Sequence, residues 1–206
     1  MSIKLEVWGD YALFTRPEMK TERVSYDVMT PSAARGILEA IFWHPGMMWV
    51  IDAIHVCNPI RFINIRRNEL GQKGSKLEYY DGSIEQRSSV ILRDVRYVIS
   101  AHFEMTDKAV PSDNPGKFCA MFKRRVEKGA YFHQPYFGTR EFPVYFSLCE
   151  EIPPCPDELK GHRDLGFMLF DLDYSDPKNI TPLFFKASLE NGRMTVPDRH
   201  SEEVIG

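Results

Sequence analysis

Four side chains in the first two thirds of the chain could transfer protons or stabilise negative charge. Lys117 opens a basic segment, and Tyr131 and His133 follow that segment closely. His44 lies upstream, directly before Pro45. A histidine with a pKa near ~6.5 acts as base or acid at neutral pH, and a lysine supplies a point charge. These residue types are suited to acid–base chemistry at a phosphate, with Lys117 stabilising the charge that develops.

The histidines also have plain structural interpretations. His44 can be a capping residue at the end of a helix, and His133 can be an ordinary loop residue. His55 and His102 lie in strand-like segments and are expected to be structural or surface residues. His162 and His200 lie in the acidic C-terminal part, and we expect no role for them.

Positive charge is grouped in two blocks, although the whole chain has a formal net charge of -3. Residues 61–76 and 114–129 each contain five bases and one acid. Residues 141–206 contain 13 acids and 6 bases, a balance of -7, so residues 1–140 carry +4. Grouped bases can bind a polyanion even in an acidic protein. The bases expected to bind it are Arg66, Arg67, Lys123, Arg124 and Arg125.

An aromatic loop punctuated by glycine and proline follows the second basic block. It contains more rings than such a segment is expected to bury: Tyr131, Phe132, His133, Tyr136 and Phe137. Aromatic rings beside Lys and Arg are typical of single-stranded RNA binding, because nucleobases stack on the rings while the cations neutralise phosphates. We expect Tyr131 and Tyr136 to stack in this way. The alternative is that the basic helix presents an ordinary solvated face.

The elements that must position these residues follow the order strand, helix, strand, strand, helix, strand. Thr30 and Asn114 are expected to cap the two helices, and each is followed by proline. This order is the ferredoxin-like (RRM-like) arrangement of an α+β protein. The expected strands are 3–14, 47–57, 90–105 and part of 140–150, and the expected helices are 31–44 and 115–128.

An acidic, proline-rich segment at 150–161 marks an expected domain boundary. Beyond it, further strand-like runs and the turn Asn191-Gly192 predict a small antiparallel sheet. We therefore expect a ferredoxin-like RNA-binding domain over 1–148 and a small antiparallel β domain over 149–206.

The composition is that of a folded globular protein, with 43% hydrophobic and 27% charged residues among 206. No apolar run approaches the ~20 residues of a membrane-spanning helix. The N-terminus enters a strand-like segment, so we expect no signal peptide. The four cysteines form no CxxC pattern, which predicts neither a disulfide framework nor a zinc site and fits a reducing cytoplasm: Cys57, Cys119, Cys149 and Cys155.

Several separated blocks of sequence resemble one known family. These blocks are "GDYALFT", "TPSAARGILEAIFWHP", "LRDVRYVISAHFE", "NPGKF" with "YFGTREF", and "FFKASLENGRMTVP". Their order and spacing are similar to those of the Cas-five proteins of CRISPR systems, members of the RAMP superfamily, and in particular to the type I-C (Dvulg) subtype. The resemblance covers nearly the whole chain, although the segment 68–88 is short for the family.

The resemblance implies an endoribonuclease that cuts the repeat RNA of the CRISPR precursor transcript. Such an enzyme then stays with the crRNA as a subunit of the interference complex, in the cytoplasm. The implied chemistry needs no metal or other cofactor. A general base removes the proton of a 2′-hydroxyl, which attacks the adjacent phosphate and leaves a cyclic phosphate, while a cation stabilises the added negative charge.

The residues that the resemblance implies for catalysis are only partly present. The family has Tyr at the end of the first helix and a Lys-His pair early in the second, and the matching positions here are Phe42, Lys117 and Phe118. Phenylalanine cannot transfer a proton, so two of the three roles need other residues. The candidates nearby in the sequence are His44, Tyr131 and His133.

Two other functions remain open from the sequence. The first is a subunit that holds the 5′ handle of crRNA without cutting, which the loss of Tyr and His favours. The second is a nuclease that cuts DNA with a divalent metal ion. The acids available to such a nuclease near the basic half, which are Asp10, Asp27 and Asp52, form no motif.

Overall fold

The computed structural model describes residues 2–19, 22–70, 84–174, 176 and 178–206. Most of the segment 68–88, which is short for the family, therefore lies outside the described residues. The described strands form one sheet in the order β5-β1-β4-β2-β8-β7-β6, while β3 pairs with β4 and β9 pairs with β7. Every pairing between these strands is antiparallel.

The predicted ferredoxin-like unit is confirmed. Its elements are β1 (Ile3–Ala12), α1 (Pro31–Ile41), β2 (Met47–Val56), β4 (Ile84–Met105), α2 (Pro115–Glu127) and β5 (Tyr145–Leu148). Their strands lie side by side as β5-β1-β4-β2. The last strand of the unit therefore borders the first, and the third lies between the first and the second, as in ferredoxin-like folds.

Both helices begin at the predicted caps. Thr30 Oγ1 accepts a hydrogen bond from the Ala33 N–H at 3.2 Å, and Asn114 Oδ1 accepts one from the Lys117 N–H at 2.8 Å. These bonds satisfy N–H groups that the first turn of a helix leaves without a partner inside the helix. Among the described residues, no helix is long and apolar enough to cross a membrane.

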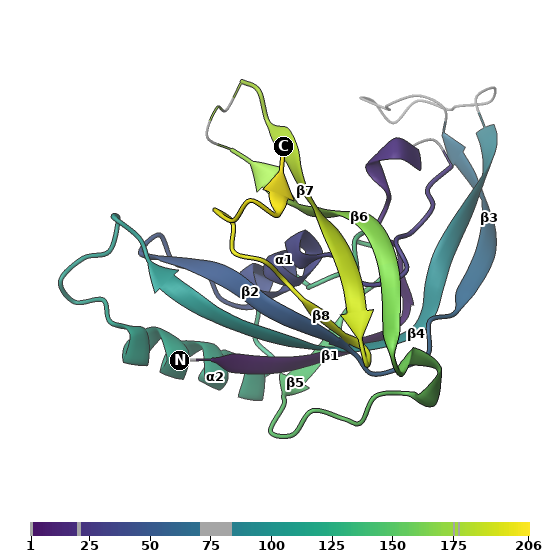
Figure 1. The fold of residues 1–206 in the computed structure, drawn as a ribbon. Coiled ribbons are helices and arrows are strands. Elements are labelled where there is room, and N and C mark those ends of the chain that lie inside the picture. The colour runs from purple at the N-terminus through teal and green to yellow at the C-terminus, as the bar shows by residue number, and fades with distance from the viewer. Residues whose placement is uncertain (1, 20–21, 71–83, 175, 177) are drawn as a thin grey trace.

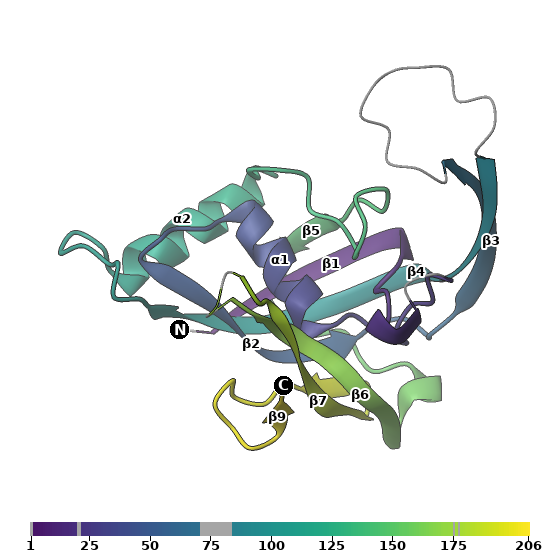
Figure 2. The same cartoon turned by 90° about the horizontal axis from the view of Figure 1, so that it is seen from above.

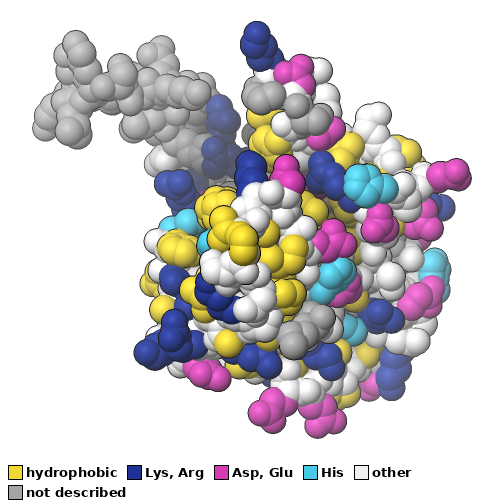
Figure 3. Space-filling view, turned by 90° about the vertical axis from the view of Figure 1, so that its left-hand side faces the viewer, with side chains coloured by type: hydrophobic (Ala, Val, Ile, Leu, Met, Phe, Trp, Pro, Cys, Tyr) yellow, Lys and Arg dark blue, Asp and Glu magenta, His cyan; other side chains and the backbone are white. Residues whose placement is uncertain are grey.

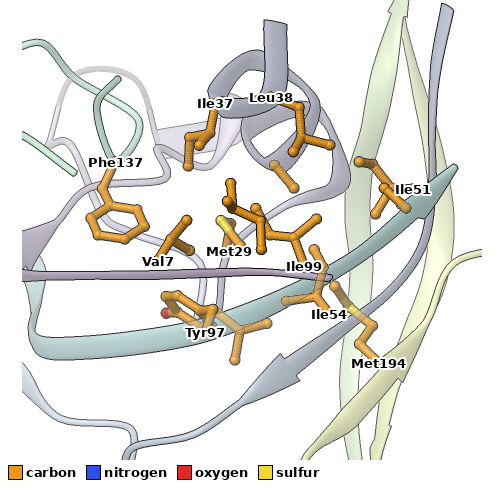
Figure 4. Packing of buried hydrophobic residues seen from close by; sticks show 14 of the residues in the cluster. Val7, Met29, Ile37, Leu38, Ile51, Ile54, Tyr97, Ile99, Phe137 and Met194 are labelled. Carbon is orange, nitrogen blue, oxygen red and sulfur yellow. The ribbon is translucent and has the colours of Figure 1, made fainter. Parts of the chain in front are cut away.

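The helices lie on the same face of the sheet (Figures 1 and 2). Buried side chains of the helices and strands form one hydrophobic core. Ile37 and Leu38 of α1 point toward Val7 of β1 and Ile99 of β4, and all four are at most 1% exposed (Figure 4). Met194 of β8 is fully buried in the same cluster. Burying each such side chain stabilises the fold by about 1.5–3 kcal/mol.

The C-terminal strands are antiparallel, as predicted. They are β6 (His162–Asp173), β7 (Thr181–Glu190), β8 (Arg193–Thr195) and β9 (Val204–Ile205). A short 3-10 helix, Asp157–Leu159, precedes β6, and another, Pro17–Met19, follows β1. The Asn191-Gly192 turn is confirmed, with φ of 49° and 75°. The β8 strand pairs with β2, so the sheet and its core continue into the C-terminal part. A domain division at residue 148 stays a prediction.

One hairpin is not predicted by the sequence patterns. The expected strand 90–105 begins at Ile84, because its first half pairs with β3 (Phe62–Leu70). The sequence of β3 reads only as part of a basic block. From Arg66 to Asn68 its polar residues face other polar residues across the hairpin, as Arg66 faces Ser88, so apolar alternation does not continue past Ile65. The hairpin projects from the body of the molecule (Figures 1 and 2).

The aromatic loop is tied to the end of β1 at Gly138. The Leu13 N–H donates to the Phe137 carbonyl at 3.1 Å. Gly138 has a φ of +79°, and a Cβ added there would lie 1.9 Å from the Leu13 carbonyl oxygen. The backbone conformation and the close approach both require glycine.

We expect Gly138→Ala to lower the free energy of unfolding by at least about 1–2 kcal/mol, the cost of a left-handed residue with a Cβ, because the clash adds to that cost. Gly129→Ala is the matched control, since Gly129 also has a positive φ, of +62°, but no atom within 4 Å of the added Cβ. Urea denaturation measures both variants. Equal losses of stability would show that the close approach to Leu13 contributes nothing.

Candidate functional site

The chain that leaves α1 runs back along α2. Arg125, in the last turn of α2, donates its Nε to the Ile41 carbonyl at 2.6 Å. The Phe42 ring lies 6.0 Å from the ring of Phe118 in the first turn, and the His44 ring lies 4.8 Å from it. The segment from Ile41 to His44 therefore follows α2 toward its N-terminus. This path carries His44 to the end at which Lys117 lies.

A buried carboxylate joins His44 and Lys117. Asp113 Oδ2 lies 3.8 Å from His44 Nδ1, and Asp113 Oδ1 lies 3.5 Å from Lys117 Nζ. The Asp113 side chain is 2% exposed, whereas those of His44 and Lys117 are 37% and 45% exposed. The two predicted residues are thus brought together, with their own side chains still open to a ligand. Sequence reasoning missed Asp113, although its place four residues before Lys117 was a usable signal.

The backbone at Gly46 decides which nitrogen of His44 accepts a hydrogen bond. The Gly46 N–H donates to His44 Nδ1 at 3.1 Å. Because Nδ1 accepts, the neutral imidazole carries its proton on Nε2. A Cβ at Gly46 would lie 2.9 Å from Asp113 Oδ2 and 3.0 Å from Ala109 Cα. A side chain at this position would crowd both the Asp113 carboxylate and the His44 imidazole, whose Nδ1 would lie 3.2 Å from the added Cβ.

Tyr131 and His133 lie near the other end of α2. The helix rises about 1.5 Å per residue, so its length alone separates Lys117 from Glu127 by about 15 Å. Tyr131 packs its ring edge-on at 6.5 Å from Phe146, and the His133 ring lies 6.2 Å from that of Tyr136. Neither ring touches the Lys117 side chain, whose partners are Asp113 and the Ser112 carbonyl. The four predicted catalytic residues therefore form two separate groups.

The aromatic loop divides its rings between core and surface. Phe137 is fully buried, whereas Tyr131 is 42% and Phe132 is 60% exposed. His133 and Tyr136 line a pocket of about 320 Å³ beside the first turns of α1. The expectation that these rings are not all core residues is confirmed. Base stacking by Tyr131 and Tyr136 stays a prediction.

The predicted RNA-contacting bases differ in how free they are. Lys123 and Arg124 are exposed on α2, and Arg66 is exposed on β3. Arg125 is held by its bond to α1, and its guanidinium stacks 4.2 Å from the Phe132 ring. Arg67 is paired with Glu141. Figure 3 faces the end at which α2 begins, where Lys and Arg side chains are interspersed with hydrophobic ones.

The remaining histidines and acids have structural partners in several cases. Burial, with Arg193 and Lys4 nearby, lowers the pKa of His55. His102 Nδ1 lies 2.7 Å from Asp52 Oδ1. In the part of the chain that the structure describes, no group of three or more His, Cys, Asp or Glu could hold a metal ion. The four cysteines are free thiols, and burial raises the pKa of Cys57 to about 11.

Residues 2–197 match the family model described as "CRISPR-associated protein (Cas_Cas5)", named Cas_Cas5d. The chain belongs to the Cas5d family. It is 49% identical to the CRISPR pre-crRNA endoribonuclease Cas5d of Mannheimia succiniciproducens, over 98% of this chain and 97% of that protein. It is 40% identical to the CRISPR pre-crRNA endoribonuclease Cas5d of Thermus thermophilus, over 98% of this chain and 94% of that protein.

Solved structures similar to this Cas5d family member agree with the fold. One is a functionally uncharacterized protein from Streptococcus mutans, with a TM-score of 0.75 and 25% identity. Another is described as a CRISPR-associated protein, with a TM-score of 0.74 and 25% identity. Each match covers 100% of this chain and 97% of the other.

Two positions at which the Cas5d resemblance implies proton-transferring side chains are part of the core. Phe42 is 3% exposed and Phe118 is 1% exposed. Trp49 Nε1 donates to the Phe42 carbonyl at 2.9 Å, which fixes the segment that carries His44. The family resemblance implies a histidine at position 118. Here the residue at that position is Phe118, and His44, which follows α1 in the sequence, packs against its ring.

We expect Arg125→Ala to lower the free energy of unfolding by about 1.5–3 kcal/mol, because it removes a charge-assisted hydrogen bond. Lys123→Ala, on the exposed face of the same helix, should change it by less than about 0.5 kcal/mol. Thermal and urea unfolding of the two variants check this difference. A stable Arg125→Ala variant would return Arg125 to the set of free RNA-contacting bases.

Proposed function

We propose that the chain is a pre-crRNA endoribonuclease that cuts repeat RNA by metal-independent attack of a 2′-hydroxyl. It then remains bound to the crRNA with the other subunits of the interference complex, in the cytoplasm. The two curated relatives, at 49% and 40% identity, are named for pre-crRNA cleavage. The observation that carries the proposed site is the approach of His44 and Lys117 to one buried carboxylate.

The N-terminus of α2 is a suitable place for the scissile phosphate. N–H groups and the helix dipole favour an anion there. Lys117 lies in this first turn with an ammonium group that is open to solvent. Its charge would stabilise the negative charge that builds on phosphorus during the attack.

His44 supplies the proton transfer in this proposal. Its imidazole packs against Phe118, the position at which the family resemblance implies a histidine. His44 can donate the Nε2 proton to the departing 5′-oxygen as the imidazolium, in which Nδ1 also carries a hydrogen and faces Asp113 Oδ2 instead of accepting from Gly46. Removal of the 2′-hydroxyl proton by the same residue requires the proton to sit on Nδ1, beside Asp113.

A non-cleaving subunit that holds the 5′ handle of crRNA is the second candidate. It is favoured by the burial of phenylalanine at positions 42 and 118, where proton-transferring residues were implied. Cleavage by the purified chain separates the two candidates. A third possibility from the sequence, DNA cleavage with a divalent metal ion, predicts cutting only after Mg²⁺ or Mn²⁺ is added.

We expect Lys117→Ala and His44→Ala each to slow repeat-RNA cleavage by ~10²–10⁴-fold, the range for loss of acid–base or charge stabilisation. Binding of the RNA should stay within a few-fold, because the exposed bases along α2 and β3 are unchanged. Single-turnover rates in EDTA are the measurement. His133→Ala is the control at the other end of α2. An unchanged rate for His44→Ala together with a slow His133→Ala would move the proton transfer to the loop.

We expect Lys123→Ala with Arg124→Ala to weaken binding of many RNA sequences alike. The plot of log affinity against log salt should become shallower by about 1 for each phosphate that the variant no longer neutralises. Arg125 is left unchanged because it holds α1. Filter binding at several salt concentrations checks the slope, with cleavage blocked by Lys117→Ala in both proteins. An unaltered slope would place the RNA on another face.

A further inference from the structure

We propose that Asp113 is the positioning residue of this site, which holds the Lys117 ammonium and the His44 imidazole for the same phosphate. The proposal rests on the proposed function. Asp113 contacts neither RNA nor the reacting atoms itself, because its side chain is 2% exposed. It acts through the two residues on either side of its carboxylate.

The carboxylate is fixed before any ligand arrives. Asp113 Oδ2 accepts from the Val110 N–H at 3.2 Å, and the Asp113 N–H donates to the Val110 carbonyl at 2.8 Å. The loop that carries it is anchored on the turn between α1 and β2. Thr106 donates its Oγ1 to the Pro45 carbonyl at 2.6 Å and its N–H to the Gly46 carbonyl at 3.0 Å. The position of Asp113 is thereby tied to that of His44.

The two oxygens of Asp113 have different tasks. Oδ1 faces Lys117 Nζ at 3.5 Å, which restrains a flexible side chain near the start of α2. Lys117 Nζ also donates to the Ser112 carbonyl, at 3.4 Å. Restraining the ammonium before RNA binds removes part of the entropy cost of aligning it with the phosphate.

Oδ2 faces His44 Nδ1, the nitrogen that accepts from Gly46. When the imidazole takes up a proton, both ring nitrogens carry hydrogen, and Nδ1–H can no longer accept from the Gly46 N–H. A carboxylate at 3.8 Å then stabilises the imidazolium and fixes the ring orientation, which is the part that an aspartate plays beside a catalytic histidine. Gly46 and Asp113 thus favour different protonation states of one ring.

The test is Asp113→Asn, which keeps the size of the side chain and an oxygen that can accept from Val110. We expect cleavage under single-turnover conditions in EDTA to slow by about 10²-fold, the scale of effect for a misplaced reacting group, with RNA affinity within a few-fold. Asp107→Asn is the matched control, because Asp107 is exposed on the same loop. An Asp113→Asn variant that cleaves at the rate of the unaltered chain would overturn the proposal.

A double-mutant cycle separates positioning from a general effect on the fold. The rate losses of Asp113→Asn and Lys117→Ala should combine to less than their product, because the carboxylate acts through the ammonium that the second change removes. If the rate loss of the double variant equals the product of the two single losses, Asp113 does not act through Lys117, and that part of the proposal is overturned. If Asp113→Asn does not fold, Asp113→Glu keeps the charge but displaces it. It should then slow cleavage without weakening RNA binding, and full activity would overturn the proposal.

The imidazole nitrogen signals of His44 in an NMR spectrum give a readout that does not need cleavage. We expect them to shift in Asp113→Asn and to stay in place in Asp107→Asn. Unchanged signals in Asp113→Asn overturn the role toward His44. If the unaltered chain does not cut RNA but the signals shift, the proposed function fails while the positioning role of Asp113 stands.

Discussion

The packing around Phe118 is the interaction on which the arrangement of the site depends. This ring is buried in the first turn of α2 and contacts Phe42, His44 and Phe103. The aromatic cluster fixes the segment after α1, the start of α2 and the C-terminal end of β4 relative to one another. A phenylalanine that cannot transfer a proton therefore positions a histidine that can.

The sequence was sufficient for the ferredoxin-like order and for both helix starts, because these features depend on local patterns. Thr30 and Asn114 cap through bonds to residues three positions on. The spacing of Asp113 from Lys117 was visible in the sequence, but its contact with His44 was not. His44 is far away in the sequence and is brought near Asp113 by the path of the chain along α2. Tyr131 is the converse case, since closeness in sequence to α2 does not bring its ring to Lys117.

Counting charges also overstated what is available to a ligand. Arg125 belongs to the basic helix by sequence, but its guanidinium donates a hydrogen bond to the last residue of α1 and stacks on the Phe132 ring. Arg67 is similarly engaged by Glu141. Arginine suits such structural tasks because its planar group can hydrogen-bond and stack at the same time. The bases that remain open are fewer and lie on two separate elements, α2 and the β3–β4 hairpin.

The pairing of β8 with β2 has a consequence for how the chain folds. Ala53 of β2 lies opposite Thr195 of β8, about 140 positions later. One edge of β2 therefore stays unpaired until β8, near the end of the chain, has been synthesised. Pairing between such distant positions carries a large loop-closure cost and slows folding. While the ribosome is still making the later strands, β2 exposes an unpaired edge on which other chains can assemble. This topology therefore requires that the unpaired edge of β2 be protected from other chains during synthesis.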